Sequence, residues 1–597
     1  MYLLTQIELA LIKHISLSLN VDFEREVLNG EATLNFDVLE NIVDVPLDIS
    51  NLTIEHIETE GVQLQYKLGE HIPNVGSSLR VVLPKPAAKG EKLEIKIRYT
   101  TDPSASALTW LKAPQTSGNK HPYVFSQSSP IHARSILPCQ DTPAVKFTFD
   151  AEVTAPEGFT VLMGALRGDV NNNKTKFNQP LPIPSNLFAI AAGVLESRTV
   201  GPRTKIWSEK EDVDKSAQEF SETEQYLQAA ERLCTPYDWT EYDLLVLPPA
   251  FPHGAMENPC LTFVSPTTVV GDKSLADVII HEIMHSWTGN SVSIKNFEHF
   301  WLKEGFTVFL ERKVTASFIN DTAESRRNRD FHSLLGLQSL TEGVNTLGAT
   351  NPLTKLVLDL DGVHPDEAFS IIPYEKGSLF LRYLEDLFGG PEVFDNYIRS
   401  YVTKFRMQSI DTEQFKTHFI EYFKDHDKLK EVDWDAWLHT SGMPPVIPDY
   451  DTTMTEAVTA LASHIDRDDY TFSYDDVSNF NVHQLIYLLQ QLIEKPPMSL
   501  EKLKRLGDAY KVVGSENKEI LYRWVRLRVR SRDDGVISEV FSFLNSLGRL
   551  KYVRPLYREL YAWEDVREQA INNFLENEQY MSHLTAYNLR NDLYLNK

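Results

Sequence analysis

Hydrophobic and polar residues alternate with a period of two through much of the first two hundred residues. The alternation is clearest at residues 15–21, 34–38 and 93–97, and it is typical of β-strands with one buried and one solvent-facing side. Turn-forming residues separate such segments, for example at 169–174 (DVNNNK) and 181–185 (LPIPS). The pattern predicts an antiparallel β domain over residues 1–200.

The hydrophobic spacing changes to that of helices from about residue 201 onward. We predict three helices with a short strand between the first two: helices at 216–233, 274–288 and about 298–314, and the strand at 242–246. Ser274 is the expected N-cap of the second helix, and Gly289-Asn290 is its expected end. This region is therefore expected to form a second, largely helical domain.

A proline-rich stretch at 444–448 (PPVIP) predicts the next domain boundary. Amphipathic helical patterns follow it at 482–494, 500–513 and 517–530, although they match no named repeat. The chain is thus predicted to be a multidomain α+β protein. Its domains are expected over residues 1–200, 201–446 and 447–597, and the last is expected to be an all-α domain of stacked helices.

The composition excludes several classes of partner. With 59 Lys and Arg against 84 Asp and Glu, the net charge of −25 disfavours nucleic acid and anionic membranes. The apolar run at 187–195 is too short to cross a bilayer, and the N-terminus lacks the basic region of a signal peptide.

An odd count of three cysteines argues against a disulfide framework and favours a reducing compartment. We expect a cytoplasmic protein.

A metal-binding motif lies on the second predicted helix. His281 and His285 are one helical turn apart, so both imidazoles can reach one ion. Glu304, on the following predicted helix, supplies the expected third ligand. Two histidines, one carboxylate and an open position are typical of catalytic zinc, so we expect one zinc ion per chain. The alternative is a buried helix whose two histidines have other partners.

Two further acids have expected roles around this ion. Glu282, inside the motif, would face the water that the zinc activates and take its proton. Glu311 lies two turns after Glu304 on the same helix face and could accept a hydrogen bond from a ligand histidine. The alternative for Glu311 is an exposed acid beside Arg312.

The motif and Glu304 together resemble those of the gluzincin aminopeptidases, as does the segment Gly254-Ala255-Met256-Glu257-Asn258. Four longer stretches resemble the leukotriene A(4) hydrolase branch of that family: 136–143 (ILPCQDTP), 242–249 (YDLLVLPP), 256–264 (MENPCLTFV) and 373–377 (PYEKG). The resemblance extends to residue 554. It implies a saddle-like β domain, a thermolysin-like catalytic domain and a helical C-terminal domain, with the active site in the cleft between them.

The resemblance also implies which residues hold the substrate. Glu257 matches the acid that binds the free α-ammonium of a peptide, whose pKa of about 8 keeps it charged at neutral pH. The neighbouring Gly254, Ala255, Met256 and Asn258 would lie along the substrate. Gln127 matches a residue near the amine site, where Ser129 replaces a glutamine. Without the resemblance, Glu257 would more often be a solvated loop acid.

Other matched residues concern the reaction and the far end of the substrate. Tyr374 matches the tyrosine that donates its hydroxyl to the oxyanion, although from sequence alone a packed tyrosine is the commoner case. Asp366 matches an acid that positions peptides and, in bifunctional members, opens an epoxide. Arg549 and Lys551 match a basic pair that binds the carboxylate of a short peptide.

These observations predict a zinc aminopeptidase that acts on short peptides with a free N-terminus. Two alternatives remain: epoxide hydrolysis of a lipid in the same site, and a non-catalytic peptide-binding protein. Phe369 and His253 stand where the bifunctional enzymes carry tyrosines, which bears on the lipid activity and on side-chain preference. The helical C-terminal region could also serve as a protein-interaction surface, and the sequence does not specify an oligomeric state.

Overall fold

β-strands dominate the N-terminal part of the chain in the computed structural model, which describes residues 4–467 and 469–596. The largest sheet has eight strands in the order β13 (Leu166–Asn171), β14 (Lys174–Pro184), β11 (Lys146–Thr154), β1 (Ala10–Asp22), β2 (Val27–Val38), β8 (Lys92–Thr100), β4 (Thr53–Thr59) and β5 (Val62–Gln63). The three clearest alternating segments lie in β1, β2 and β8. The predicted antiparallel β domain is confirmed, with one exception: β1 and β11 pair in parallel.

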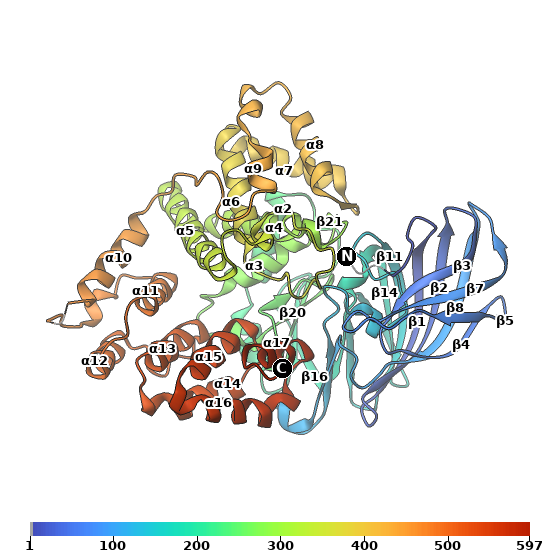
Figure 1. Cartoon of the computed structure of the whole chain (residues 1–597), viewed down its shortest axis with the longest axis horizontal. Coiled ribbons are helices and arrows are strands. Elements are labelled where there is room, and N and C mark those ends of the chain that lie inside the picture. The colour runs from blue at the N-terminus through green and yellow to red at the C-terminus, as the bar shows by residue number, and fades with distance from the viewer. Residues whose placement is uncertain (1–3, 468, 597) are drawn as a thin grey trace.

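Two smaller sheets complete this β region, which lies at the right of Figure 1. They are β12 (Thr160–Met163), β15 (Ile190–Gly193), β10 (Tyr123–Ser126) and β9 (Leu108–Leu111), and β3 (Ile42–Ile49), β7 (Ser77–Ala87) and β6 (Gln65–Leu68). One continuous hydrophobic core lies among the sheets and extends to Leu245 and Phe263 of the next region. The β region is therefore packed firmly against the part of the chain that follows.

The predicted turn at 181–185 is wrong, because most of it belongs to strand β14. Two prolines suggested a break, since proline cannot donate a hydrogen bond within a sheet. The pairing between β13 and β14 extends only to Asn178. Among the described strands, Pro182 and Pro184 therefore have a neighbour on one side only, β11. The other predicted turn, at 169–174, contains the tight connection between β13 and β14.

A five-stranded sheet and a group of helices form the central region. The sheet order is β16 (Leu195–Thr199), β17 (Lys205–Glu209), β18 (Asp243–Val246), β20 (Leu261–Val264) and β19 (Ala255–Met256), and β18 is the strand predicted at 242–246. The helices that matter for the site are α3 (Ala276–His285), α4 (Trp301–Ala316) and α6 (Ile372–Leu387). They share one hydrophobic core.

Two of the helix predictions in this region need correction. The range 216–233 is not one helix but two, α1 (Val213–Glu219) and α2 (Thr223–Leu233), because Phe220 turns into the core and the Thr223 hydroxyl donates to its carbonyl. Helix α3 begins after Leu275, and Ser274 is not its cap. The Ser274 hydroxyl instead accepts a hydrogen bond from Asn517 of the C-terminal region, a contact that local sequence cannot reveal.

The described residues of the C-terminal region, at the lower left of Figure 1, form helices and the loops between them. The helices are α10 (Thr453–Ile465), α11 (Val482–Glu494), α12 (Leu500–Tyr510), α13 (Lys518–Arg530), α14 (Ile537–Asn545), α15 (Leu550–Ala562), α16 (Glu564–Asn577) and α17 (His583–Asp592). The three predicted helices correspond to α11, α12 and α13. Helix α13 contributes to both hydrophobic cores of this region, through Val525 to one and Trp524 to the other. Residues 439–452, which include the proline-rich stretch, form neither helix nor strand.

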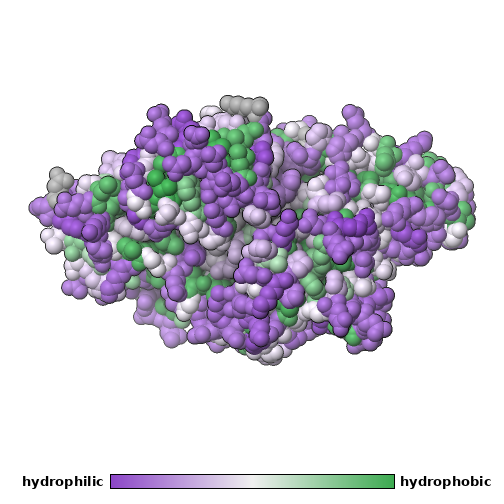
Figure 2. All heavy atoms as spheres, turned by 90° about the horizontal axis from the view of Figure 1, so that it is seen from below, coloured by the Kyte–Doolittle hydropathy of each residue, from purple (hydrophilic) through white to green (hydrophobic). Residues whose placement is uncertain are grey.

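The face shown in Figure 2 carries mostly hydrophilic residues, with hydrophobic ones scattered among them. Within the described ranges, every helix is too short or too polar to cross a membrane. Cys139, Cys234 and Cys260 are all buried and unbonded to one another.

A buried lysine anchors helix α6 to the loops beside it. The Lys376 ammonium donates to the carbonyls of Thr354, Thr440 and Gly442 at 2.9–3.0 Å. We predict that Lys376→Met lowers the free energy of unfolding by about 3 kcal/mol, because it leaves these carbonyls without their donor. The melting temperature measures the effect. Lys424→Met, at a lysine that is 59% exposed, is the control and should change the melting temperature little. Equal melting temperatures for the two variants would contradict the anchoring role of Lys376.

Candidate active site

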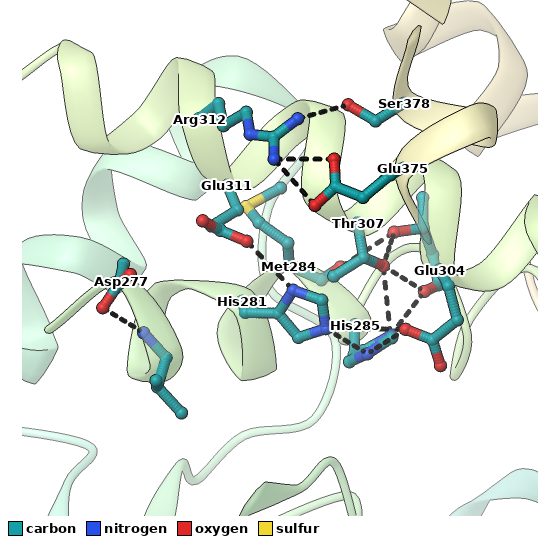
Figure 3. A network of polar contacts seen from close by, with 12 residues as sticks. Asp277, His281, Met284, His285, Glu304, Thr307, Glu311, Arg312, Glu375 and Ser378 are labelled. Carbon is teal, nitrogen blue, oxygen red and sulfur yellow. Dashed lines mark hydrogen bonds and ion pairs between the residues drawn. The ribbon is translucent and has the colours of Figure 1, made fainter. Parts of the chain in front are cut away.

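Helices α3 and α4 bring the predicted metal ligands together. Ile280, Ile283 and Met284 bury one side of α3 in the central core, and His281 and His285 project toward α4. Glu304, in the first turn of α4, lies opposite them. Its Oε2 atom is 3.5 Å from His281 Nε2 and 3.4 Å from His285 Nε2, and the two Nε2 atoms are 3.1 Å apart (Figure 3).

The hydrogen bonds of the two rings show that this arrangement fits a cation. His285 Nδ1 lies 2.9 Å from the Thr288 carbonyl, which can only accept, so Nδ1 carries the proton. His281 Nδ1 lies 3.1 Å from Glu311 Oε2 and donates in the same way. With each Nδ1 engaged in this way, the Nε2 atom of each ring is the one that faces Glu304, whose Oε2 atom is buried without a hydrogen-bond donor among the described residues. Glu304 and Glu311 raise the pKa of His281 although burial acts to lower it, so the cluster favours a positive charge. Two Nε2 atoms and one carboxylate oxygen are a donor set that suits zinc.

Glu311 lies on the face of α4 that its sequence position indicated. Its side chain is 15% exposed, so it is not a solvated surface acid. Arg312 points elsewhere and binds both oxygens of Glu375 on α6, at 2.9 and 2.8 Å (Figure 3). The contact with Glu311 fixes both the orientation and the tautomer of His281.

A cavity of about 350 Å³ opens beside the three ligands. All three parts of the chain line it: Gln127 and Ser129 from the β region, Tyr374 and Asp366 from the central region, and Arg549 from the C-terminal helices. Every site residue predicted from the sequence lines this cavity except Asn258 and Lys551. Of these two, Asn258 is buried to 4% exposure, and Lys551 pairs with Glu519 of α13 at 2.5 Å.

Glu282 is buried at the edge of the cavity, and its Oε2 atom has no hydrogen-bond partner among the described residues. Burial raises the pKa of its carboxyl to about 7, with further contributions from Glu257 and Glu304 that oppose the lowering effect of the two histidines. An oxygen of Glu282, an oxygen of Glu257 and a nitrogen of His285 all lie within 4.8 Å of one another. Glu282 can therefore reach the same space as the ligand atoms.

Tyr374 lies in the first turn of α6, with its ring stacked against that of His281 at 6.3 Å between centroids. Burial and the nearby acids, Glu304 first among them, raise the pKa of its hydroxyl well above the ordinary value. The hydroxyl thus keeps its proton and can donate. Phe300 and Phe369 pack against the same ring.

Arg549 reaches the cavity from the start of α15. Its guanidinium donates to the hydroxyls of Thr267, at 3.0 Å, and Tyr552, at 3.2 Å. A Cβ atom at position 254 would lie 2.6 Å from Arg549 Nη2, so a side chain there would force the guanidinium to move. Glycine therefore allows the 254–258 segment to pass directly beside the guanidinium.

Two residues that contact predicted site residues were missed in the sequence. Lys303 places its Nζ atom 2.6 Å from Glu257 Oε1 and 3.1 Å from Glu304 Oε1. His132 Nε2 lies 3.0 Å from Asp366 Oδ2, and this contact lowers the pKa of Asp366 although burial acts to raise it. Neither residue belongs to a motif, and the His132 contact joins residues far apart in the chain.

Known proteins resemble this chain along almost its whole length. Residues 12–187 match the peptidase M1 N-terminal domain, 216–437 the peptidase family M1 domain, and 480–593 the C-terminal domain of leukotriene A4 hydrolase. A leukotriene A-4 hydrolase from Xenopus laevis is 44% identical, over 98% of this chain and 97% of that protein. Leucine aminopeptidase 2 from Ajellomyces capsulatus is 37% identical, over 98% and 95%. The structure of yeast LTA4 hydrolase in complex with bestatin superimposes with a TM-score of 0.92 at 31% identity, covering 99% of this chain and 96% of that one.

We predict that Glu311→Ala weakens zinc binding about tenfold to a hundredfold, because His281 loses the acceptor that orients its ring. Competition with a chromogenic chelator measures the zinc affinity. Glu324→Ala, at an exposed acid in the next helix, serves as the matched control. An unchanged affinity in the Glu311 variant would show that His281 needs no such support.

Proposed function

The chain belongs to the peptidase M1 family and is a zinc-dependent aminopeptidase, and we propose that it removes the N-terminal residue of short peptides through the residue roles set out below. One observation carries the proposal. The three converging ligand atoms, Glu257 and Arg549 share one cavity, so a metal, a site for a free amine and a site for a carboxylate lie within the length of a short peptide.

His281, His285 and Glu304 are proposed to hold one zinc ion per chain. Zinc bound there supplies Lewis acidity and lowers the pKa of water toward neutrality. Glu282 accepts the proton of the attacking water and passes it to the departing amine. Support comes from its buried carboxylate, whose Oε2 atom lacks a partner among the described residues, and from its closeness to His285.

Tyr374 is proposed to stabilise the oxyanion that forms as the scissile carbonyl is attacked. Its hydroxyl keeps its proton, and Tyr374 lines the cavity that the ligands border. A donor that meets charge only in the transition state raises kcat without tightening substrate binding.

Strand β19 offers an edge along which the substrate can lie. It is the last strand of its sheet and pairs only with β20 among the described strands. The other edge of Ala255 and Met256 can pair with an extended peptide. Glu257 follows directly, so its carboxylate meets the α-ammonium at the end of that strand, with Gln127 beside it.

Arg549 is proposed to bind the carboxylate at the other end of the peptide. Its hydrogen bonds in the described structure go to two neutral hydroxyls. Glu519, the acid whose pKa it helps to lower, is paired directly with Lys551, so the guanidinium can still bind an anion. Because the amine and carboxylate sites both border one cavity of about 350 Å³, short peptides fit both at once. Asp366 and Ser129 line the same cavity and are proposed to position the peptide backbone.

Epoxide hydrolysis is the second candidate activity. It is supported by the 44% identity to the leukotriene A-4 hydrolase of Xenopus laevis and by the position of Asp366 in the cavity, where its carboxylate is held by His132. Incubation with leukotriene A4 and detection of an enzymatic diol product tests it, and Asp366→Asn should abolish that product. Absence of the diol from the wild-type reaction would exclude this activity.

A cytoplasmic location is also proposed. It is supported by the three buried cysteines, none of which forms a disulfide in the described structure. The net charge of −25 supports peptides rather than nucleic acid or anionic membranes as partners.

We predict that Glu282→Gln lowers kcat on aminoacyl arylamides by about a thousandfold or more, and that Tyr374→Phe lowers it by about a hundredfold to a thousandfold. The zinc content of both variants should equal that of the wild type, which metal analysis checks. N-acetylated arylamides are the control substrates and should not be cleaved. Cleavage of the acetylated and free substrates at equal rates would contradict recognition of the N-terminus.

We predict that Arg549→Met raises KM for tripeptides by about tenfold to a hundredfold, since their carboxylate loses a charged partner. Aminoacyl arylamides have no such carboxylate, so their KM should not change. Arg558→Met is the matched control, at an arginine on the same helix that is 48% exposed and pairs with Asp592. A parallel rise in KM for both kinds of substrate would argue against carboxylate binding by Arg549.

A further inference from the structure

A buried lysine contacts one oxygen of the carboxylate that is proposed to bind the substrate amine. Lys303 Nζ lies 2.6 Å from Glu257 Oε1 and 3.1 Å from Glu304 Oε1. The side chains of Lys303 and Glu257 are 7% and 4% exposed, and both line the catalytic cavity. The ammonium also lies 5.2 Å from the ring centroid of Phe300. Lys303 is therefore held in place from several sides, next to the point where a peptide would begin.

The charges around the cavity explain why this lysine matters. The Lys303 ammonium faces both Glu257 and Glu304, so part of their negative charge is compensated before a substrate binds. A substrate α-ammonium at Glu257 therefore approaches a carboxylate whose Oε1 atom already contacts a positive charge. Two cations a few ångströms apart in a buried site repel each other.

We propose that Lys303 is a specificity-determining residue, whose ammonium competes with the α-ammonium of the substrate for Glu257. The inference rests on the amine-binding role proposed for Glu257. Because of this competition, the enzyme binds peptides with a free N-terminus more weakly than it would if Lys303 were uncharged. Ligands without a charged amine do not meet this competition. Lys303 thus narrows the difference in affinity between charged and uncharged N-terminal groups.

The test compares two small ligands that differ only in that group: leucinol, which carries the ammonium, and 4-methylpentane-1,2-diol, which carries a hydroxyl in its place. Calorimetry gives the dissociation constant of each. In Lys303→Gln, the dissociation constant of leucinol should fall about tenfold, a change of the size that one charged contact produces. The dissociation constant of the diol should change by less than about twofold. The KM for leucyl arylamide should fall together with the dissociation constant of leucinol.

Two further variants test whether the effect comes from the charge of Lys303 rather than from its size or from its helix, α4. Lys303→Arg keeps the positive charge and should bind leucinol as the wild type does. Lys313→Gln removes a lysine from the same helix that pairs with Glu385 and Asp395 outside the cavity, so it should leave both dissociation constants unchanged. If Lys303→Gln fails to retain zinc, the leucinol-to-diol ratio is compared in zinc-free wild type and variant, for which the same shift is expected.

Glu257→Gln distinguishes a failure of this inference from a failure of the proposed function. It should weaken leucinol binding, and in the double variant with Lys303→Gln the gain from removing the lysine should vanish. Unchanged leucinol binding in Glu257→Gln would refute the amine-binding role itself. Weakened binding there, combined with an equal or larger leucinol dissociation constant in Lys303→Gln, would overturn the Lys303 inference alone.

Discussion

The convergence of two imidazole Nε2 atoms and one carboxylate oxygen is the constraint on which the rest of the site depends. The Nε2 atoms of His281 and His285 lie 3.1 Å apart, and Glu304 Oε2 lies within 3.5 Å of both. The surroundings hold the three side chains in this arrangement. The Thr288 carbonyl and Glu311 fix the two tautomers, and the apolar side of α3 is anchored in the central core. Folding energy from hydrophobic packing thus keeps polar groups in positions that favour metal binding.

The cavity depends equally on contacts between parts of the chain that are distant in sequence. Backbone hydrogen bonds join Gly548 to Pro249 and Leu550 to Pro252, at 2.8 and 2.9 Å. They set the position of Arg549 relative to the strand that is proposed to bind the peptide. On the other side, the core of the β region continues into Phe263 of strand β20. The central region, which carries most of the candidate site residues, is therefore packed against the β region on one side and the C-terminal helices on the other.

Local patterns predicted much of this architecture, and long-range contacts account for what they missed. Short stretches of sequence were enough to predict the strands with alternating burial, the helices α11 to α13 and the motif from His281 to His285. Glu304 could be predicted because it lies on the next helix along the chain. Ser274 failed as a cap because its partner is Asn517, far along the chain. Lys551 stays a prediction, and its ammonium pairs with Glu519 on another helix, a contact that local sequence does not reveal. Lys303 was not predicted as a site residue because it contacts Glu257, which lies in a separate segment of the sequence.

The close approach of Gly254 to Arg549 ties two distant positions to each other. Any larger residue at 254 would force the guanidinium to move, and with it the hydrogen bonds that Arg549 donates to Thr267 and Tyr552. A substitution in the central region would thus displace a charge that the C-terminal region supplies to the cavity.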